Sequence, residues 1–432
     1  MQLFSWLPFV SGRDDRKLFR PLSEDEKKAF KLHLISAILG GISVGVIINH
    51  EYIAVNGLHA SQWQITALTM LWPISNVLSV FINHWIDSRG RYDRAVLLIG
   101  VLSRLPVALM FFSSNVNVLL LLLLLFFASN SVLIPAQNTI MKQRYRSSNR
   151  ARLFGWWSSI LTLFSLPMAM FVGALLDVDF QYYRILFVVE ALFGAGQAVF
   201  LSIMARGMKP GLSNKSTGKG VAHFLGSLWA VFRRDKEFAC FEAFFFLYGI
   251  AFLMILPVIP FFATDRLGLN YEQYAMAKGV IGQMGILFLS PVMGVRLEKL
   301  RPFRFTGIVC LVLAFYPLSM AVGNWIPDLG TFFFYFAFVI FAVGMAGISV
   351  SWNISSMHFA PHGQEATYQG LHVTLTALRA SFAPILGSVL LHYFGYSEAF
   401  LVSTGIFIIA GILFLGKYRK KKRGEAQQSV KF

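Results

Sequence analysis

Apolar runs of about twenty residues recur along the whole chain, and short polar stretches separate them. A helix needs about 20 apolar residues to cross the hydrocarbon core of a bilayer, and such runs therefore predict membrane-spanning helices. The first six runs lie at 33–55, 62–84, 95–113, 117–140, 153–176 and 183–205. Six more lie at 238–263, 271–294, 304–323, 329–355, 366–392 and 396–416.

A polar stretch rich in Gly, Ser, Thr and Lys separates the two sets of runs and indicates a loop. The pattern predicts an all-α membrane protein with twelve transmembrane helices in two pseudo-symmetric six-helix bundles. The expected parts are a cytoplasmic tail 1–32, a bundle 33–205, a cytoplasmic loop 206–237, a bundle 238–416 and a basic cytoplasmic tail 417–432.

The composition agrees with lipid as the solvent. Apolar residues make up 56% of the 432 residues and charged residues only 14%, against about 25% charged residues in soluble domains. The sequence holds no zinc spacing, nucleotide-binding loop or nucleophile elbow. The two cysteines, Cys240 and Cys310, lie inside apolar runs without the spacing of a metal site. We therefore expect no enzymatic activity, no cofactor and no metal.

The net charge of +17 has an uneven distribution along the chain. Most of the 38 Lys and Arg residues fall in the tails and in alternate loops, while the intervening loops hold Arg184 and Arg266. The loop between spans ten and eleven departs from this pattern, because it has His358 and His362 but no Lys or Arg. Positive residues favour the cytoplasmic side, so both termini are predicted to be cytoplasmic. The charge excess thus reflects topology, and we expect no nucleic-acid partner.

The loop after span two holds a charged motif. It reads N-H-W-I-D-S-R-G-R-Y-D-R and resembles the cytoplasmic G-x-x-x-D-R-x-G-R-R motif of the major facilitator superfamily, with Asn83 in place of the first glycine. Gly90 permits a tight reversal between helices. The charges can meet a helix end or lipid headgroups. The candidate gating residues of this loop are Asp87, Gly90, Arg91 and Arg94.

A degenerate copy of the motif follows span eight, where it includes Gly294 and Glu298. The resemblance implies a secondary transporter in which the loop after span two latches two bundles that rock about a central site. Span five lacks the G-P-x-x-G-G run associated with proton-coupled antiporters of the superfamily. The motifs therefore identify no subfamily.

Charged side chains inside the spans are the first candidates for binding or coupling. A charge near the middle of a bilayer costs about 2.5–3.5 kcal/mol, so such a residue normally faces a cavity or a partner. Lys278 and Arg379 lie in spans that flank the central cavity of the family, where two cations would attract a carboxylate or phosphate. Arg104 lies in a peripheral span, and a structural role is favoured for it. Glu190 and Glu242 complete the set.

Further polar residues extend the candidate set. Asn130, Asn353 and His372 lie inside spans four, ten and eleven, where they can supply hydrogen bonds along a path. His50 and Glu51 close the first span near its outer end. An exposed Glu–His pair can exchange protons near neutral pH, but a plain location at the membrane interface is favoured for both.

The leading functional prediction is a secondary active transporter of a small solute by alternating access. An anionic solute is the favoured cargo, with H⁺ as a candidate coupling ion. One alternative is a proton-coupled exporter of hydrophobic or cationic compounds, in which Glu51, Glu190 and Glu242 would matter. Another is a non-transporting receptor or lipid-handling protein on the same scaffold. We expect a monomer in a bacterial inner membrane whose other partners are lipids.

Overall fold

The computed structural model describes residues 22–89, 92–208, 230–361 and 364–429. These residues form helices and no strands. The helices of the first half are α1 (Glu24–Ile47), α2 (His50–Tyr52), η2 (Ile53–Gly57), α3 (Gln62–Arg89), α4 (Tyr92–Arg104), η3 (Leu105–Phe112), α5 (Val116–Arg144), α6 (Ser147–Val178), η4 (Phe180–Tyr182) and α7 (Tyr183–Ala205).

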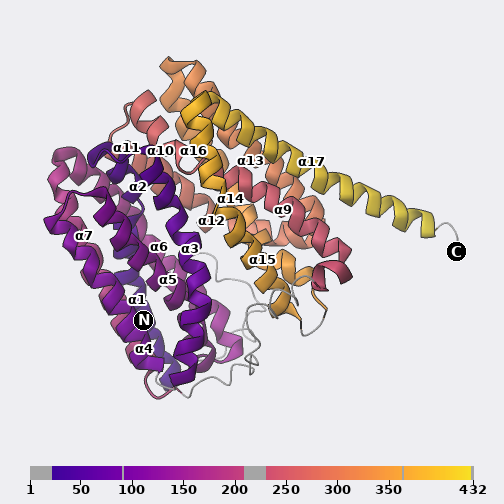
Figure 1. Cartoon of the computed structure of the whole chain (residues 1–432). Coiled ribbons are helices and arrows are strands. Elements are labelled where there is room, and N and C mark those ends of the chain that lie inside the picture. The colour runs from indigo at the N-terminus through magenta and orange to yellow at the C-terminus, as the bar shows by residue number, and fades with distance from the viewer. Residues whose placement is uncertain (1–21, 90–91, 209–229, 362–363, 430–432) are drawn as a thin grey trace, which may run out of the picture.

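The helices of the second half form a bundle beside the first (Figure 1). They are α9 (Lys236–Met254), α10 (Val258–Phe261), η5 (Phe262–Arg266), α11 (Tyr271–Tyr274), η6 (Ala275–Ile281), α12 (Gly282–Leu300), α13 (Pro302–Trp325), η7 (Pro327–Leu329), α14 (Gly330–Phe359), α15 (Glu365–Ala380), α16 (Ala383–Phe394) and α17 (Tyr396–Ser429).

The helices match the expected apolar runs closely. Within the described residues, ten helical stretches are long and apolar enough to cross a membrane, and a bent pair, Tyr271–Ser290 with Val292–Leu300, makes an eleventh. α3 occupies the place of the second expected span but is not among them. The all-α membrane fold is confirmed, while the count of twelve spans stays a prediction.

Polar caps fix where several helices begin. Ser23 and Glu26 form a reciprocal capping box at the start of α1. Asn115 accepts a backbone hydrogen bond at the start of α5, as Asp235 does at α9 and Asn270 at α11. Each cap satisfies backbone N–H groups that the first helical turn leaves without partners.

Prolines account for breaks inside two spans. α9 ends at Met254 shortly before Pro257, and α16 begins with Ala383 and Pro384 after the end of α15. Proline lacks a backbone N–H and clashes with the preceding helical turn, so it interrupts a helix. Spans seven and eleven are therefore each divided into consecutive helices rather than continuous ones.

The last helix is longer than the sequence suggests. α17 continues to Ser429 and extends beyond the body of the second bundle (Figure 1). Residues 417–429, which were expected as a tail, are rich in Lys, Arg, Glu, Ala and Gln. These residues have high helix propensity, which explains why the helix does not stop at the end of the apolar run.

Each bundle packs mainly on itself. In the first half α1 contacts α6 and α7, and α4 contacts α7; in the second half α13 contacts α14 and α17. The two halves meet where α11 and η6 contact α6, and where α15 and α16 contact α3. Two pairs of spans therefore connect the bundles.

Hydrogen bonds between the bundles gather at the end of the molecule where α2, α10 and α11 lie (Figure 1). The Asp177 carboxylate at the end of α6 accepts the N–H groups of Tyr271 (2.8 Å) and Glu272 (2.9 Å). Gln62 and Thr66 at the start of α3 bond to Ser388 of α16. The charge pattern predicts this to be the outer end, and we call it the predicted outer end.

Close helix contact within the second bundle yields a first prediction. A Cβ atom added at Gly387 of α16 would lie 1.6 Å from the carbonyl oxygen of Met254, whereas one added at Gly405 of α17 would meet nothing within 4 Å. Gly387→Ala should destabilise the protein by about 1–3 kcal/mol, because the backbones must separate. Thermal unfolding in detergent should show a lower midpoint for Gly387→Ala and an unchanged one for Gly405→Ala. Equal midpoints for the two variants would contradict this packing.

Candidate functional site

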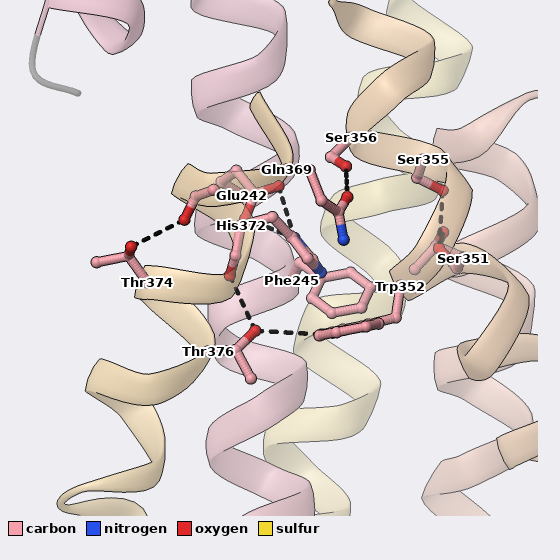
Figure 2. A network of polar contacts seen from close by, with 12 residues as sticks. Glu242, Phe245, Ser351, Trp352, Ser355, Ser356, Gln369, His372, Thr374 and Thr376 are labelled. Carbon is pink, nitrogen blue, oxygen red and sulfur yellow. Dashed lines mark hydrogen bonds and ion pairs between the residues drawn. The ribbon is translucent and has the colours of Figure 1, made fainter. Parts of the chain in front are cut away.

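A carboxylate and an imidazole are directly bonded inside the second bundle. Glu242 of α9 lies opposite His372 of α15, as Figure 2 shows. The Nδ1 atom of His372 is 2.9 Å from Oε1 and 3.0 Å from Oε2 of Glu242. The residues are only 2% and 1% exposed. Two candidates that are distant in the sequence thus form one buried pair.

A hydroxyl network continues from this pair along α15 (Figure 2). Thr376 donates to the carbonyl of His372 at 2.9 Å and accepts the indole N–H of Trp352 at 3.3 Å. Gln369, one turn before His372 on α15, accepts a hydrogen bond from the hydroxyl of Ser356 on α14. The network joins α14 to α15 and fixes the backbone that carries His372.

Arg379 lies two turns beyond His372 and is buried. Its Nη2 atom donates to Thr376 Oγ1 at 3.1 Å, and Nη1 donates to the carbonyl oxygen of Phe245. The guanidinium also lies over the rings of Phe245 and Tyr248, at 5.1 and 5.7 Å from their centroids. Within the described residues, no carboxylate lies at ion-pair distance from it. Oxygen dipoles and ring faces therefore compensate this charge.

The first bundle contains a fully buried ion pair. Arg104 Nη1 of α4 lies 2.8 Å from Glu190 Oε1 of α7, and Ser43 Oγ of α1 bonds to both. Arg104 also donates to Asn130 of α5 and lies 4.0 Å from the ring centroid of Phe126. One ion pair thus connects four spans, which agrees with a structural role for Arg104.

A third pair crosses between the bundles. The ammonium of Lys278 in η6 bonds to the carboxylate of Glu51 in α2. The exposed Glu–His pair considered from the sequence does not occur, because each side chain is only 8% exposed; their location at the membrane interface stays a prediction. His50 bonds through Nδ1 to the carbonyl of Ile47 rather than to Glu51. The second bundle covers this end of the first span, which the first half alone would leave open.

The remaining candidates do not converge on these pairs. Asn353 is exposed and donates to the carbonyl of Ser349 one turn earlier at 2.7 Å. In the loop motifs, Arg94 and Glu298 are exposed and Gly294 is half-buried. Gly90 and Arg91 lie outside the described residues, as does the side chain of Asp87.

Two polar groups with contacts to distant parts of the chain escaped the sequence reasoning, one of them buried and the other exposed. His33 of α1 is fully buried, stacks on Trp157 at 5.4 Å, and bonds to Gln137 and Tyr145. Asp177 bonds to the start of α11. His33 opens an apolar run and Asp177 closes one, which are ordinary positions for polar residues. His33 differs from an ordinary helix-end residue only in being buried, and Asp177 only in lying next to α11. The sequence shows neither property.

Two helical bundles with charged pairs buried within and between them define a polytopic membrane protein of the transporter type. The chain belongs to the Major Facilitator Superfamily, whose family model matches residues 33–384. The resemblance found in the loop motif is thereby confirmed at the level of the superfamily.

One similar curated protein is the proton-coupled antiporter flippase LtaA of Staphylococcus haemolyticus. It is 26% identical over 224 residues, which cover 50% of this chain and 53% of that protein. The chain thus matches about half the length of this relative.

Solved structures of transporters share the fold. The nucleoside transporter NupG superposes with a TM-score of 0.67 at 13% identity, covering 92% of this chain and 99% of that chain. A bacterial homologue of the human lysosomal transporter Spinster, inward-facing and unoccupied, superposes with a TM-score of 0.65 at 17% identity, with coverages of 92% and 99%. At such identities the likeness concerns the fold alone.

The ion pair of the first bundle yields a second prediction. Arg104→Met would leave the Glu190 carboxylate buried without its counter-charge, and breaking one side of a buried pair costs about 3–5 kcal/mol. The double variant Arg104→Met/Glu190→Met should recover part of that loss, because neither charge remains. Thermal unfolding in detergent measures both changes. A single variant as stable as the wild type would contradict the structural role.

Proposed function

We propose that this protein is a proton-coupled secondary transporter that works by alternating access, with the Glu242–His372 pair as the site of proton exchange. The direct bond between these two buried side chains is the observation that carries the proposal. Imidazole is the side chain that titrates closest to neutral pH. The net charge of a bonded carboxylate–imidazole pair can therefore change within the physiological pH range.

The other nitrogen of His372 supports the same assignment. Nδ1 faces the carboxylate of Glu242, while Nε2 has no hydrogen-bond partner within the described structure. The ring can thus bind a second proton without breaking its bond to Glu242. Glu190 differs, because its partner Arg104 carries a guanidinium that stays protonated at any physiological pH.

The arrangement of intramembrane charges bears on the cargo. Arg104 and Lys278 each face a carboxylate, so their charges are already compensated. An anionic substrate would then find only Arg379 among the three candidate cations. We therefore favour a hydrophobic or amphipathic cargo moved against protons, and the likeness to a proton-coupled antiporter flippase over half of the chain supports this choice.

Transport of a small anion is the second candidate. The observation that favours it is Arg379, which is buried within the span and has no carboxylate at ion-pair distance among the described residues. A carboxylate or phosphate could replace the carbonyl and hydroxyl oxygens that its guanidinium now contacts.

The leading proposal predicts gradient-dependent transport in proteoliposomes. Ethidium would serve as a hydrophobic cationic probe and a short-chain fluorescent glycolipid as an amphipathic one. At least one of them should move faster under an imposed pH gradient. Glu242→Gln should lose this gradient dependence, because the protonated imidazole of His372 no longer has a carboxylate to stabilise its charge.

Glu398→Gln provides the matched control, since Glu398 is exposed at the start of α17. It should keep the wild-type response. Gradient dependence that survives in Glu242→Gln would remove the proposed coupling site. Movement of both probes at the rate of empty liposomes would count against the cargo.

A separate uptake experiment distinguishes the two candidate functions. Radiolabelled benzoate and inorganic phosphate would be offered to liposomes containing wild type, Arg379→Lys or Arg379→Gln. The leading proposal predicts uptake no greater than into empty liposomes for all three proteins. Uptake by the wild type that is kept in Arg379→Lys and lost in Arg379→Gln would instead favour transport of a small anion.

A further inference from the structure

The ion pair between the bundles lies in an unusual stretch of backbone. Lys278 belongs to η6, a π-helix near the start of span eight, and Glu51 is followed by the π-helix η2. Such wide turns are rare in proteins and occur often at functional sites. In this protein they place the two charged side chains against each other from opposite bundles.

An aromatic stack lies beside the ion pair. Tyr52, next to Glu51, stacks on Tyr274 with ring centroids 4.1 Å apart and planes 8° from parallel. The ammonium of Lys278 lies 5.7 Å from the ring centroid of the same Tyr274. The hydroxyl of Tyr52 donates to the carbonyl of Leu269. The side chain of Tyr52 from the first bundle therefore contacts both α11 and the residue segment just before it.

A second, chemically different contact joins the bundles at the same end. The carboxylate of Asp177 bonds to two N–H groups at the start of α11, where the helix dipole also favours negative charge. Gly173 lets α6 approach closely, because a Cβ there would lie 2.8 Å from the Cα of Glu272. Asp177 thus holds α11, and Glu51 holds η6, which follows α11 directly.

We propose that Glu51 is a proton-binding site at the predicted outer end, and that protonation of its carboxylate releases Lys278 and lets the bundles separate there. The role of this protonation in a transport cycle rests on the proposed proton-coupled function. The ionised carboxylate attracts the ammonium and accepts its hydrogen bond. The protonated acid is neutral and loses that attraction, while the Asp177 contacts remain.

Few groups besides Lys278 can influence this carboxylate. His50 adjoins it on the same helix, and Tyr274 and Tyr316 interact with it from α11 and α13. The phenols stay neutral near pH 7. His50 is fixed through Nδ1 to Ile47 and can gain a charge at its other nitrogen. The test must therefore distinguish Glu51 from His50.

Glu242 and Glu51 have different proposed roles because they lie at different positions. Glu242 lies inside one bundle, so its protonation does not by itself separate the bundles. Glu51 lies between them, so its protonation weakens their contact directly. A proton entering from the predicted outer side would open that end first, and the deeper pair would then exchange its proton.

Distances between spin labels test this proposal on the full-length protein in lipid nanodiscs. Cysteines replace Phe112 and Leu329, which are exposed at the predicted outer ends of the two bundles, in a background with both native cysteines changed to serine. Between pH 8 and pH 4, a range that reaches the ordinary pKa of a glutamate side chain, the wild type should gain a population with longer distances. Glu51→Gln should show that population at every pH, with the pH dependence lost.

Two further variants keep the test decisive. Glu51→Asp retains the acid and should retain the pH dependence, which also guards against a folding defect in Glu51→Gln. Asp177→Asn should lengthen the distances at all pH values but keep their dependence on pH.

The proposal is overturned if wild-type distances do not change with pH, or if the change persists in Glu51→Gln, which would assign it to His50. Loss of the change in Asp177→Asn would overturn it as well. The measurement requires no substrate, so its outcome is separate from that of the transport assays on Glu242.

Discussion

A charge inside a membrane must be compensated by another charge or by aligned dipoles, and this constraint determines where the helices of this protein meet. The three pairs are Arg104–Glu190 and Glu242–His372, which are buried, and Lys278–Glu51, which is partly buried. The first connects spans within one bundle, the second connects spans within the other, and the third connects the bundles. Pairing thus accounts both for the cohesion of each half and for their mutual contact.

The three pairs differ in what a proton can do to them. The guanidinium of Arg104 keeps its proton, so its pair stays charged and serves structure. Glu242 faces an imidazole, which can gain or lose a proton without leaving its place. Glu51 faces a flexible ammonium on the other bundle. In the proposed function, the fixed charge pair holds a bundle and the two exchangeable pairs couple protons to the movement of the bundles.

The sequence predicted the positions of the spans because apolar length follows directly from bilayer thickness. It did not predict the break before Ala383, where a proline interrupts an apolar run that reads as continuous. It also did not predict the burial of Glu51, because the covering helix comes from residues far along the chain. The sequence shows how many charged groups lie in the spans but not which of them form pairs. For this reason the sequence alone favours an anionic substrate, whereas the structure pairs two of the three cations, Arg104 and Lys278, with carboxylates.

The most direct test of the account is the protonation of Glu242 itself. Infrared difference spectra of the purified protein between pH 8 and pH 5 report the C=O stretch of a carboxylic acid in an apolar environment. The comparison is made in a Glu51→Gln background, which removes the band expected from Glu51. There the account predicts a titrating band of this kind with and without Glu398→Gln, and its absence once Glu242→Gln is added. A band that titrates identically with Glu242→Gln added would contradict proton exchange at this pair.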